Sequence, residues 1–138
     1  MSICVIRDYK KPEDTNFILN SWVKSYEVSD WAKHLNLGLF RVKHRSFIEK
    51  IIDRPDVDIH IAVNKHDTDQ IYGYAIGQPE DCLHFIYCKK VFRGMGVGKE
   101  LFEKYKFPER FEYSHFLPNF HRLTRSNYAI YNPYRFFA

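Results

Sequence analysis

The chain has 138 residues, which is close to the usual size of one domain and enough to bury one hydrophobic core. Hydrophobic residues make up 45% of the sequence and aromatic residues 17%, a composition that excludes a disordered chain. The net charge of +4 is small and scattered, so it argues against nucleic acid as a partner, although it suits an anionic small molecule.

The sequence carries no signal for a membrane, for export or for a metal. Its longest apolar runs are too short to cross a bilayer. The first eight residues lack the basic start and apolar stretch of a signal peptide, which favours a cytoplasmic location. Cys4, Cys82 and Cys88 lack C-x-x-C spacing, and no Cys or His pair has zinc-finger spacing. We therefore expect reduced cysteines and no metal site.

The first half of the chain predicts one strand and two helices. Residues 3–9 alternate weakly, which indicates a strand. Pro12 and the acids after it are typical of a helix start, and an apolar stripe at helical spacing follows: Phe17, Ile18, Trp22, Val23 and Tyr26. Residues 29–40 show no clean period and are predicted to form a loop. A second helix is expected over residues 43–52, before Pro55.

Three strands and a third helix are expected next. Strict alternation over residues 57–63 predicts a strand, and residues 71–76 are its expected hairpin partner. Residues 82–88 form the next predicted strand, and residues 97–105 the next helix. No repeat or linker divides the sequence, so residues 1–138 are expected to form a single domain.

A glycine-rich turn joins the strand at 82–88 to the helix at 97–105. It reads Arg93-Gly-Met-Gly-Val-Gly98 and is followed by Lys99. Glycines leave backbone N–H groups uncovered, and a helix start is electropositive, so the turn favours a phosphate or pyrophosphate ligand. A P-loop is excluded because Arg93 takes the place of its first glycine and Glu100 follows Lys99. A turn that needs small residues only for its geometry is the alternative.

This turn resembles the R-x-x-G-x-G pyrophosphate loop of the GCN5-related N-acetyltransferases. The predicted order of elements is also similar to that family. The resemblance implies an α/β (α+β) fold with a mixed central sheet and the element order β-α-α-β-β-β-α-β-α-β. It also implies acetyl-coenzyme A as the cofactor and a primary amine, on a small molecule or a protein, as the acetyl acceptor.

The resemblance further implies which residues hold the cofactor. In this family the pantetheine lies in a gap between the fourth and fifth strands, and here its amides would pair with Ile86 and Cys88. The pyrophosphate would lie on the loop and its basic flanks, which comprise Arg93, Gly94, Met95, Gly96, Val97, Gly98 and Lys99.

Candidate acid and base residues are less sharply marked. Tyr131 resembles the tyrosine that protonates the leaving thiolate in the family, with Tyr128 and Tyr134 as rivals; packing is the alternative role for all three. His84 and His115 are candidate general bases because histidine titrates in the required range. A structural role for each histidine, and direct attack by a neutral amine, both stay open.

The C-terminal segment is short for the family. Residues 111–116 predict a strand, residues 119–125 a short helix, and residues 128–137 an aromatic strand-like end. In this respect the chain resembles acetyltransferase-like bacteriophage products, which would place it in a host cytoplasm. An exposed last strand suggests a homodimer through edge pairing.

Two other functions fit parts of the sequence. The chain would be a catalytically inactive module that binds coenzyme A or a partner protein if the acid and base are absent. A nucleic-acid binder would use the aromatic residues of the C-terminal segment with three arginines, Arg122, Arg125 and Arg135.

Overall fold

The computed structural model describes residues 2–116 and 128–137. The chain divides into two compact units, one formed by Lys10–Arg54 and the other by the segments Met1–Tyr9 and Pro55–Ala138. The smaller unit is therefore inserted between the first and second strands of the larger one. The predicted helix at residues 119–125 lies outside the described residues.

The smaller unit contains two helices, α1 (Glu13–Tyr26) and α2 (Leu37–Ile52). Glu13 and Asp14 occupy the first turn of α1, as expected for acids at a helix N-terminus. The predicted loop over residues 29–40 is wrong at its end, because α2 begins at Leu37 and not near residue 43. The side chain of Asn36 accepts a hydrogen bond from the Leu39 N–H at 3.0 Å and so caps the earlier start.

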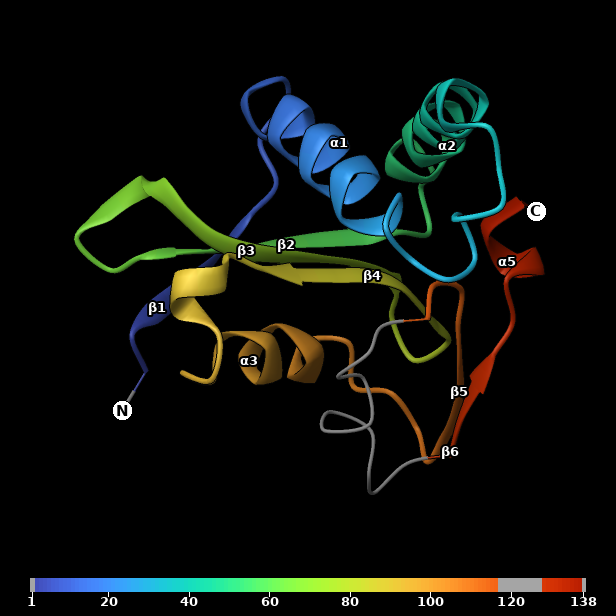
Figure 1. Ribbon diagram of the computed structural model, residues 1–138. Coiled ribbons are helices and arrows are strands. Elements are labelled where there is room, and N and C mark those ends of the chain that lie inside the picture. The colour runs from blue at the N-terminus through green and yellow to red at the C-terminus, as the bar shows by residue number, and fades with distance from the viewer. Residues whose placement is uncertain (1, 117–127, 138) are drawn as a thin grey trace. The chain divides into compact units, whose positions relative to one another are not determined.

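The larger unit is built on a mixed sheet with strand order β1-β2-β3-β4-β5-β6 (Figure 1). The strands are β1 (Cys4–Asp8), β2 (Asp58–Asn64), β3 (Asp67–Gln78), β4 (Cys82–Cys88), β5 (Arg110–Tyr113) and β6 (Tyr128–Tyr131). Strands β1 to β4 pair antiparallel, whereas β4–β5 and β5–β6 are parallel. The predicted α/β fold with a mixed central sheet is confirmed.

The described part of this unit also contains three short helices: the 3₁₀ helix η1 (Lys90–Phe92), α3 (Val97–Glu103) and α5 (Tyr134–Phe137). Val97 and Leu101 of α3 and the following Tyr105 are buried in one apolar cluster with residues of β4 and β5. This cluster also contains Leu83 and Phe111. Its packing fixes the start of α3 against the sheet, and therefore fixes the glycine turn that precedes α3.

Strands β4 and β5 pair only through the first two residues of β4 and the last two residues of β5, and beyond this point the two segments separate (Figure 1). Leu83 pairs with Tyr113, and the Ser114 N–H donates to the Leu83 carbonyl at 3.0 Å. Strand β4 continues to Cys88, whereas β5 ends at Tyr113 and not at residue 116 as predicted. A bulge marks the same place, because Gly77 pairs with Leu83 and Ile76 with Phe85, which leaves His84 as an extra residue.

The predicted strand over residues 128–137 is only partly right. Strand β6 ends at Tyr131, and residues 134–137 form the helix α5. Asn132 makes this change of direction: its N–H donates to the Tyr113 carbonyl at 2.8 Å, and its side chain accepts from the Tyr134 N–H at 3.2 Å. None of the helices in the described part of the chain is long and apolar enough to span a membrane.

Candidate functional site

The glycine turn lies between β4 and α3 and uses left-handed backbone at two positions. Gly94 has φ +81° and Gly96 has φ +87°, which other residues rarely adopt, so both glycines are needed for the path of the chain. Gly96 is the N-cap residue of α3, and Val97 directly after it is buried. The buried side chain of Val97 therefore anchors the turn to the apolar cluster.

The outer side of the turn is open. Among the residues that the structure describes, a Cβ atom placed on Gly94, Gly96 or Gly98 would have no heavy atom within 4 Å outside the adjoining residues. Arg93 and Lys99 flank this surface and are exposed. No side chain of the described residues caps the start of α3, where the first backbone N–H groups have no acceptor within the helix. The turn therefore presents N–H donors and two cations on an open surface.

Gly98 distinguishes a turn that binds phosphate from a turn that needs small residues only for its geometry. The φ of Gly98 is not in the left-handed region. Gly98 lies inside the first turn of α3, where a glycine makes a helix less stable than an alanine does, by about 1 kcal/mol. The backbone path does not require glycine there, and no atom in the described part of the chain, outside the adjoining residues, lies within 4 Å of a Cβ at this position. Close approach of a ligand to the backbone would account for a glycine at this position.

Next to the turn, the outer edge of β4 is not paired with β5, whose pairing ends at Leu83. The Lys89 N–H donates to the Tyr72 carbonyl of β3, so residue 89 faces β3. Because backbone groups alternate along a strand, Ile86 and Cys88 face the opposite side. The Cys88 carbonyl indeed accepts a hydrogen bond from Arg93 Nε at 3.0 Å. Burial raises the pKa of the partly buried Cys88 thiol.

Together these features suit one kind of ligand. The β4 edge offers backbone partners for a chain that carries amides, and the adjoining turn offers N–H donors and cations for phosphates. An extended molecule with amides at one end and phosphates at the other would fit both. Coenzyme A has this chemistry, and the residues predicted to hold it lie together in the structure.

The two candidate histidines meet in a buried polar network at the point where β4 and β5 separate. His84 Nδ1 lies 2.9 Å from Ser114 Oγ, and His115 Nδ1 lies 3.0 Å from the same oxygen. His84, Ser114 and His115 are 1–3% exposed. The His115 ring lies against Phe85 at 5.8 Å and Phe136 at 4.4 Å between ring centroids.

Gln78 at the end of β3 extends this network to the surface. Its Oε1 lies 3.2 Å from His84 Nε2 and also accepts a hydrogen bond from Arg135 Nη2 at 3.0 Å. Its Nε2 donates to Asp56 Oδ2 at 2.7 Å. A continuous line of polar contacts therefore runs from Asp56 through Gln78, His84 and Ser114 to His115.

Arg135 on α5 holds the C-terminal segment to this network. It pairs with Asp81 and Glu112, each at 2.6 Å. Hydrogen bonds from Asn132 and from Arg135 lower the pKa of Glu112. Asp81 raises the pKa of the Arg135 guanidinium further above its usual range. Both shifts favour the charged forms of Glu112 and Arg135.

Tyr131 lies on β6, beyond β5. Its ring contacts Tyr113 at 5.4 Å and Phe116 at 6.1 Å between centroids, and it is 37% exposed. The rivals Tyr128 and Tyr134 are more exposed. The structure thus brings His84 and His115 together and places Tyr131 beside Tyr113. Burial, together with the nearby Tyr131, raises the pKa of Tyr113, so its phenol keeps its proton.

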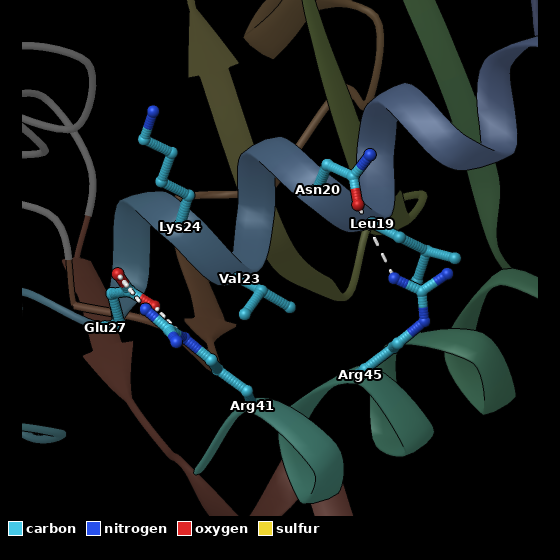
Figure 2. A pocket seen from close by; sticks show the side chains of 7 residues that line it. All are labelled: Leu19, Asn20, Val23, Lys24, Glu27, Arg41 and Arg45. Atoms are coloured by element: carbon cyan, nitrogen blue, oxygen red, sulfur yellow. Dashed lines mark hydrogen bonds and ion pairs between the residues drawn. The ribbon is translucent and has the colours of Figure 1, made fainter. Parts of the chain in front are cut away.

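A shallow pocket lies in the smaller unit, between α1 and α2 (Figure 2). Arg41 pairs with Glu27 at 3.0 Å, and Arg45 Nη1 lies 3.5 Å from Asn20 Oδ1. The predicted site residues are absent from its lining, which comprises Leu19, Asn20, Val23, Lys24, Glu27, Arg41 and Arg45. Its three cations make it a poor receptor for a positively charged amine.

Sequence reasoning missed three polar residues of the buried network: Gln78, Ser114 and Arg135 in this role. Ser114 is adjacent to His115 in the sequence, but serine beside histidine is not a recognisable motif. Gln78 and Arg135 are 57 positions apart and meet only because the sheet and α5 bring them together. Only the fold could identify these partners.

Comparisons with known proteins show what the fold resembles. No protein-family model matches the sequence, and no curated protein matches it. Among solved structures, a proposed acetyl transferase from Pyrococcus furiosus superposes with a TM-score of 0.68 at 14% identity, covering 91% of this chain and 92% of that one. A transcriptional regulator from Bacillus halodurans superposes with a TM-score of 0.51 at 14% identity, covering 88% and 89%.

A GCN5-related N-acetyltransferase from Rhodopseudomonas palustris has a TM-score of 0.54 at 19% identity over 77% of this chain. This chain spans 65% of that protein's length. At such identities the similarity concerns the fold and leaves activity and substrate open. The chain has the fold of the GCN5-related N-acetyltransferases.

Proposed function

We propose that this protein is an N-acetyltransferase that moves the acetyl group of acetyl-coenzyme A to a primary amine. The observation that carries the proposal is the open glycine turn beside the part of the β4 edge that β5 does not pair with, in a chain of this fold. Gly98 is the most informative residue, because neither the backbone path nor packing against residues 2–116 and 128–137 requires glycine at that position.

The described residues would hold the donor in two places. The Ile86 and Cys88 backbone groups would pair with pantetheine amides. The N–H groups of residues 94–98 would bind the pyrophosphate, with charge from Arg93 and Lys99. Coenzyme A supplies an activated thioester when bound, and the protein supplies position, charge and a proton acceptor.

The reaction requires two protons to leave the acceptor nitrogen. A primary ammonium first gives one proton to a base, and the resulting amine lone pair forms the N–C bond. The C–S bond breaks with its electron pair on sulfur, and the second nitrogen proton is transferred to that sulfur. The products are an amide, a thiol and a protonated base. Tyr131 is our candidate for delivering the proton to sulfur, and His84 and His115 are candidates for the base.

The proposal is tested by measuring thiol release from acetyl-coenzyme A in the presence of a panel of amines. The panel contains lysine peptides, polyamines and aminoglycosides. We expect release that depends on one class of amine and falls at least 10-fold in Arg93→Ala, since one phosphate contact of this kind contributes about 1.5–3 kcal/mol. Arg110→Ala on β5 is the control. Release that Arg93→Ala does not change would contradict the proposed site.

A second candidate is a binding module without catalysis. The similarity to a Bacillus halodurans transcriptional regulator supports this second candidate, because one fold hosts several functions. Such a module would bind coenzyme A without releasing thiol in the presence of any amine. The same amine panel distinguishes the two candidates.

A further inference from the structure

Strand β6 has an open outer edge. Among the described residues it pairs with β5 alone, and it is the last strand of the sheet (Figure 1). The N–H groups of Tyr128 and Asn132 both donate to carbonyls at or next to the ends of β5. Because backbone groups alternate along a strand, those of Ala129 and Tyr131 point away from β5. In the described part of the chain, these outward groups have no hydrogen-bond partner.

This open edge carries no charge. Strand β6 reads Tyr-Ala-Ile-Tyr, and Tyr128, Ile130 and Tyr131 are 68%, 42% and 37% exposed. Proteins usually protect an exposed edge strand with charged residues or proline. Strand β1, at the other edge of the sheet, carries Arg7 and Asp8. The β6 edge lacks this protection, so it is the uncharged edge of a protein whose net charge of +4 keeps copies apart elsewhere.

Two copies of this edge are complementary in one register. In an antiparallel pair centred on Ile130, Ala129 of each copy lies opposite Tyr131 of the other copy. These residues exchange four N–H···O=C bonds, which use all the outward backbone groups of both strands. A shift of two residues in one direction would place Pro133, which has no N–H, opposite Ala129. The opposite shift would carry Tyr131 past the start of β6 at Tyr128.

The side chains fit the same register. Each of the two hydrogen-bonded pairs combines the small Ala129 with the large Tyr131, so the bulky ring meets a small neighbour. Ile130 lies opposite Ile130 of the second copy, on the two-fold axis. A two-fold contact uses the same patch on both copies and therefore ends at two copies. This match of the edge with itself favours a second copy over a strand of unrelated sequence.

We propose that two copies of this chain form a symmetric dimer through antiparallel pairing of β6, which joins the two sheets into one. This inference does not depend on the proposed function. At roughly 200 Å² for a whole aromatic side chain, the exposed apolar side chains of β6 and α5 offer at most about 1,000 Å² for the pair. Interfaces below about 1,200 Å² are weak, so we expect a reversible dimer with a Kd of roughly 10–100 µM.

The first test is sedimentation equilibrium of the full chain over about 1–300 µM, which spans the expected Kd. We expect the average mass to rise from one copy to two with increasing concentration. A chain that stays monomeric over the whole range would overturn the proposal and would leave the β6 edge open to a strand from another protein.

The second test compares the two edges of the sheet with a matched pair of variants. Ile130 on β6 and Val5 on β1 are both 42% exposed. In Ile130→Lys two ammonium groups would lie opposite each other across the axis, so we expect association to weaken at least 10-fold. Val5→Lys should associate as the original protein does. Near-ultraviolet circular dichroism checks that both variants are folded, and equal association of the two would contradict the proposal.

Ala129→Pro removes an outward donor without touching the β5 ladder. The Ala129 N–H points away from β5, so proline is compatible with this position in the monomer. The substitution removes two of the four bonds of the dimer, one from each copy. We expect a monomer at every concentration, with the thermal unfolding of dilute protein changed little. A variant that still forms the dimer would mean that β6 edges do not pair.

The register is tested by cross-linking with diamide, a thiol oxidant. Residues directly opposite in an antiparallel pair have Cβ atoms about 4.5–5.5 Å apart, within reach of a disulfide. We expect Ile130→Cys to give a covalent dimer on a non-reducing gel. Tyr128→Cys, whose neighbour would be Asn132 of the second copy, and the original chain should give none. Cross-linking of Tyr128→Cys in preference to Ile130→Cys would contradict the pairing centred on Ile130.

Discussion

His44 lies among the aromatic rings of the smaller unit. Its imidazole stacks on Phe40 with ring centroids 4.7 Å apart and on Tyr26 at 5.5 Å, and Trp31 lies at 5.6 Å. Burial lowers the pKa of His44 to about 4, because the imidazolium would lose its hydration in these surroundings. His44 is thus a neutral packing residue at physiological pH.

This shift predicts how the stability of the protein depends on pH. The unfolded chain protonates this ring near the ordinary value of 6.5, whereas the folded chain does so near 4. The free energy of unfolding is therefore undiminished above pH 6.5 and falls as the pH decreases towards 4, by roughly 3 kcal/mol. Urea unfolding at pH 7, 5.5 and 4 measures the change. His44→Phe should remove most of this loss of stability. The same pH dependence of the free energy of unfolding in both proteins would contradict the assignment of the loss to His44.

Gly98 makes the sharpest residue-scale prediction, because stability and binding should change in opposite directions. Gly98→Ala should stabilise the chain by up to about 1 kcal/mol, since alanine favours a helix. It should weaken coenzyme A binding by about 10-fold or more, since a methyl group would occupy the open surface. Thermal unfolding and calorimetric titration measure the two effects.

Gly38 supplies the matched control within α2, where a Cβ would meet only Asn36 Oδ1 at 3.4 Å. Gly38→Ala should change stability without changing affinity for coenzyme A. If Gly98→Ala bound coenzyme A as tightly as the original protein does, ligand binding would not explain the glycine at position 98.

At the scale of elements, the β3–β4 pair shows how glycines allow a bulged sheet to pack. A Cβ on Gly77 would meet the Cys82 carbonyl oxygen at 2.8 Å and the buried Tyr105 ring at 3.2 Å. Tyr105 is fixed there, because its hydroxyl donates to the Asp58 carbonyl at 2.9 Å. Gly77 is therefore required for the close approach of β3, β4 and the residues after α3.

Gly77→Ala should lower the free energy of unfolding by about 1–3 kcal/mol, the usual cost of an overpacked core. Chemical denaturation measures this loss. Gly38→Ala again serves as the comparison, because its extra methyl group has room. A Gly77→Ala protein as stable as the original would mean that β3 and β4 can separate without cost.

Element boundaries could be predicted where one local signal dominates. Alternation identified β2, and an apolar run bounded by turn residues identified β4. The start of α2 was missed because Leu37, Leu39 and Val42 are exposed apolar residues, which obscure the helical period. The final helix was missed because aromatic residues favour strands locally, whereas Asn132 and the packing of Phe136 decide the outcome.

At the scale of the whole molecule, the C-terminal segment is joined to the sheet through charge as well as through strand pairing. Arg135 contacts Asp81 before β4, Glu112 on β5 and Gln78 on β3. These three partners are distant in sequence. Arg135 therefore holds α5 to the place where β4 and β5 meet.

Arg135→Ala should lower the free energy of unfolding by about 1–3 kcal/mol, because two carboxylates and an amide oxygen lose a shared donor. Arg135→Lys should recover only part of the lost free energy, since an ammonium cannot reproduce the hydrogen bonds that the planar guanidinium makes to both carboxylates. Denaturant unfolding measures both, with the exposed Arg110→Ala expected to stay within about 0.5 kcal/mol of the original. Equal stability of all three variants would contradict the role of Arg135.

The glycine turn and the candidate histidines could be found in the sequence because the chemistry of each depends on residue type. The arrangement of these residues in space could not be predicted from the sequence. The bulge at His84 arises from β3–β4 pairing, and the meeting of His84 with His115 arises from the parallel contact of β4 with β5. The single-domain and homodimer expectations stay predictions.

The most direct test of the central claim is calorimetric titration of the folded full chain with acetyl-coenzyme A. We expect binding in the micromolar range, or about −8 kcal/mol, which is weakened in Gly98→Ala and retained in Gly38→Ala. A chain shown to be folded that binds neither acetyl-coenzyme A nor coenzyme A would contradict it.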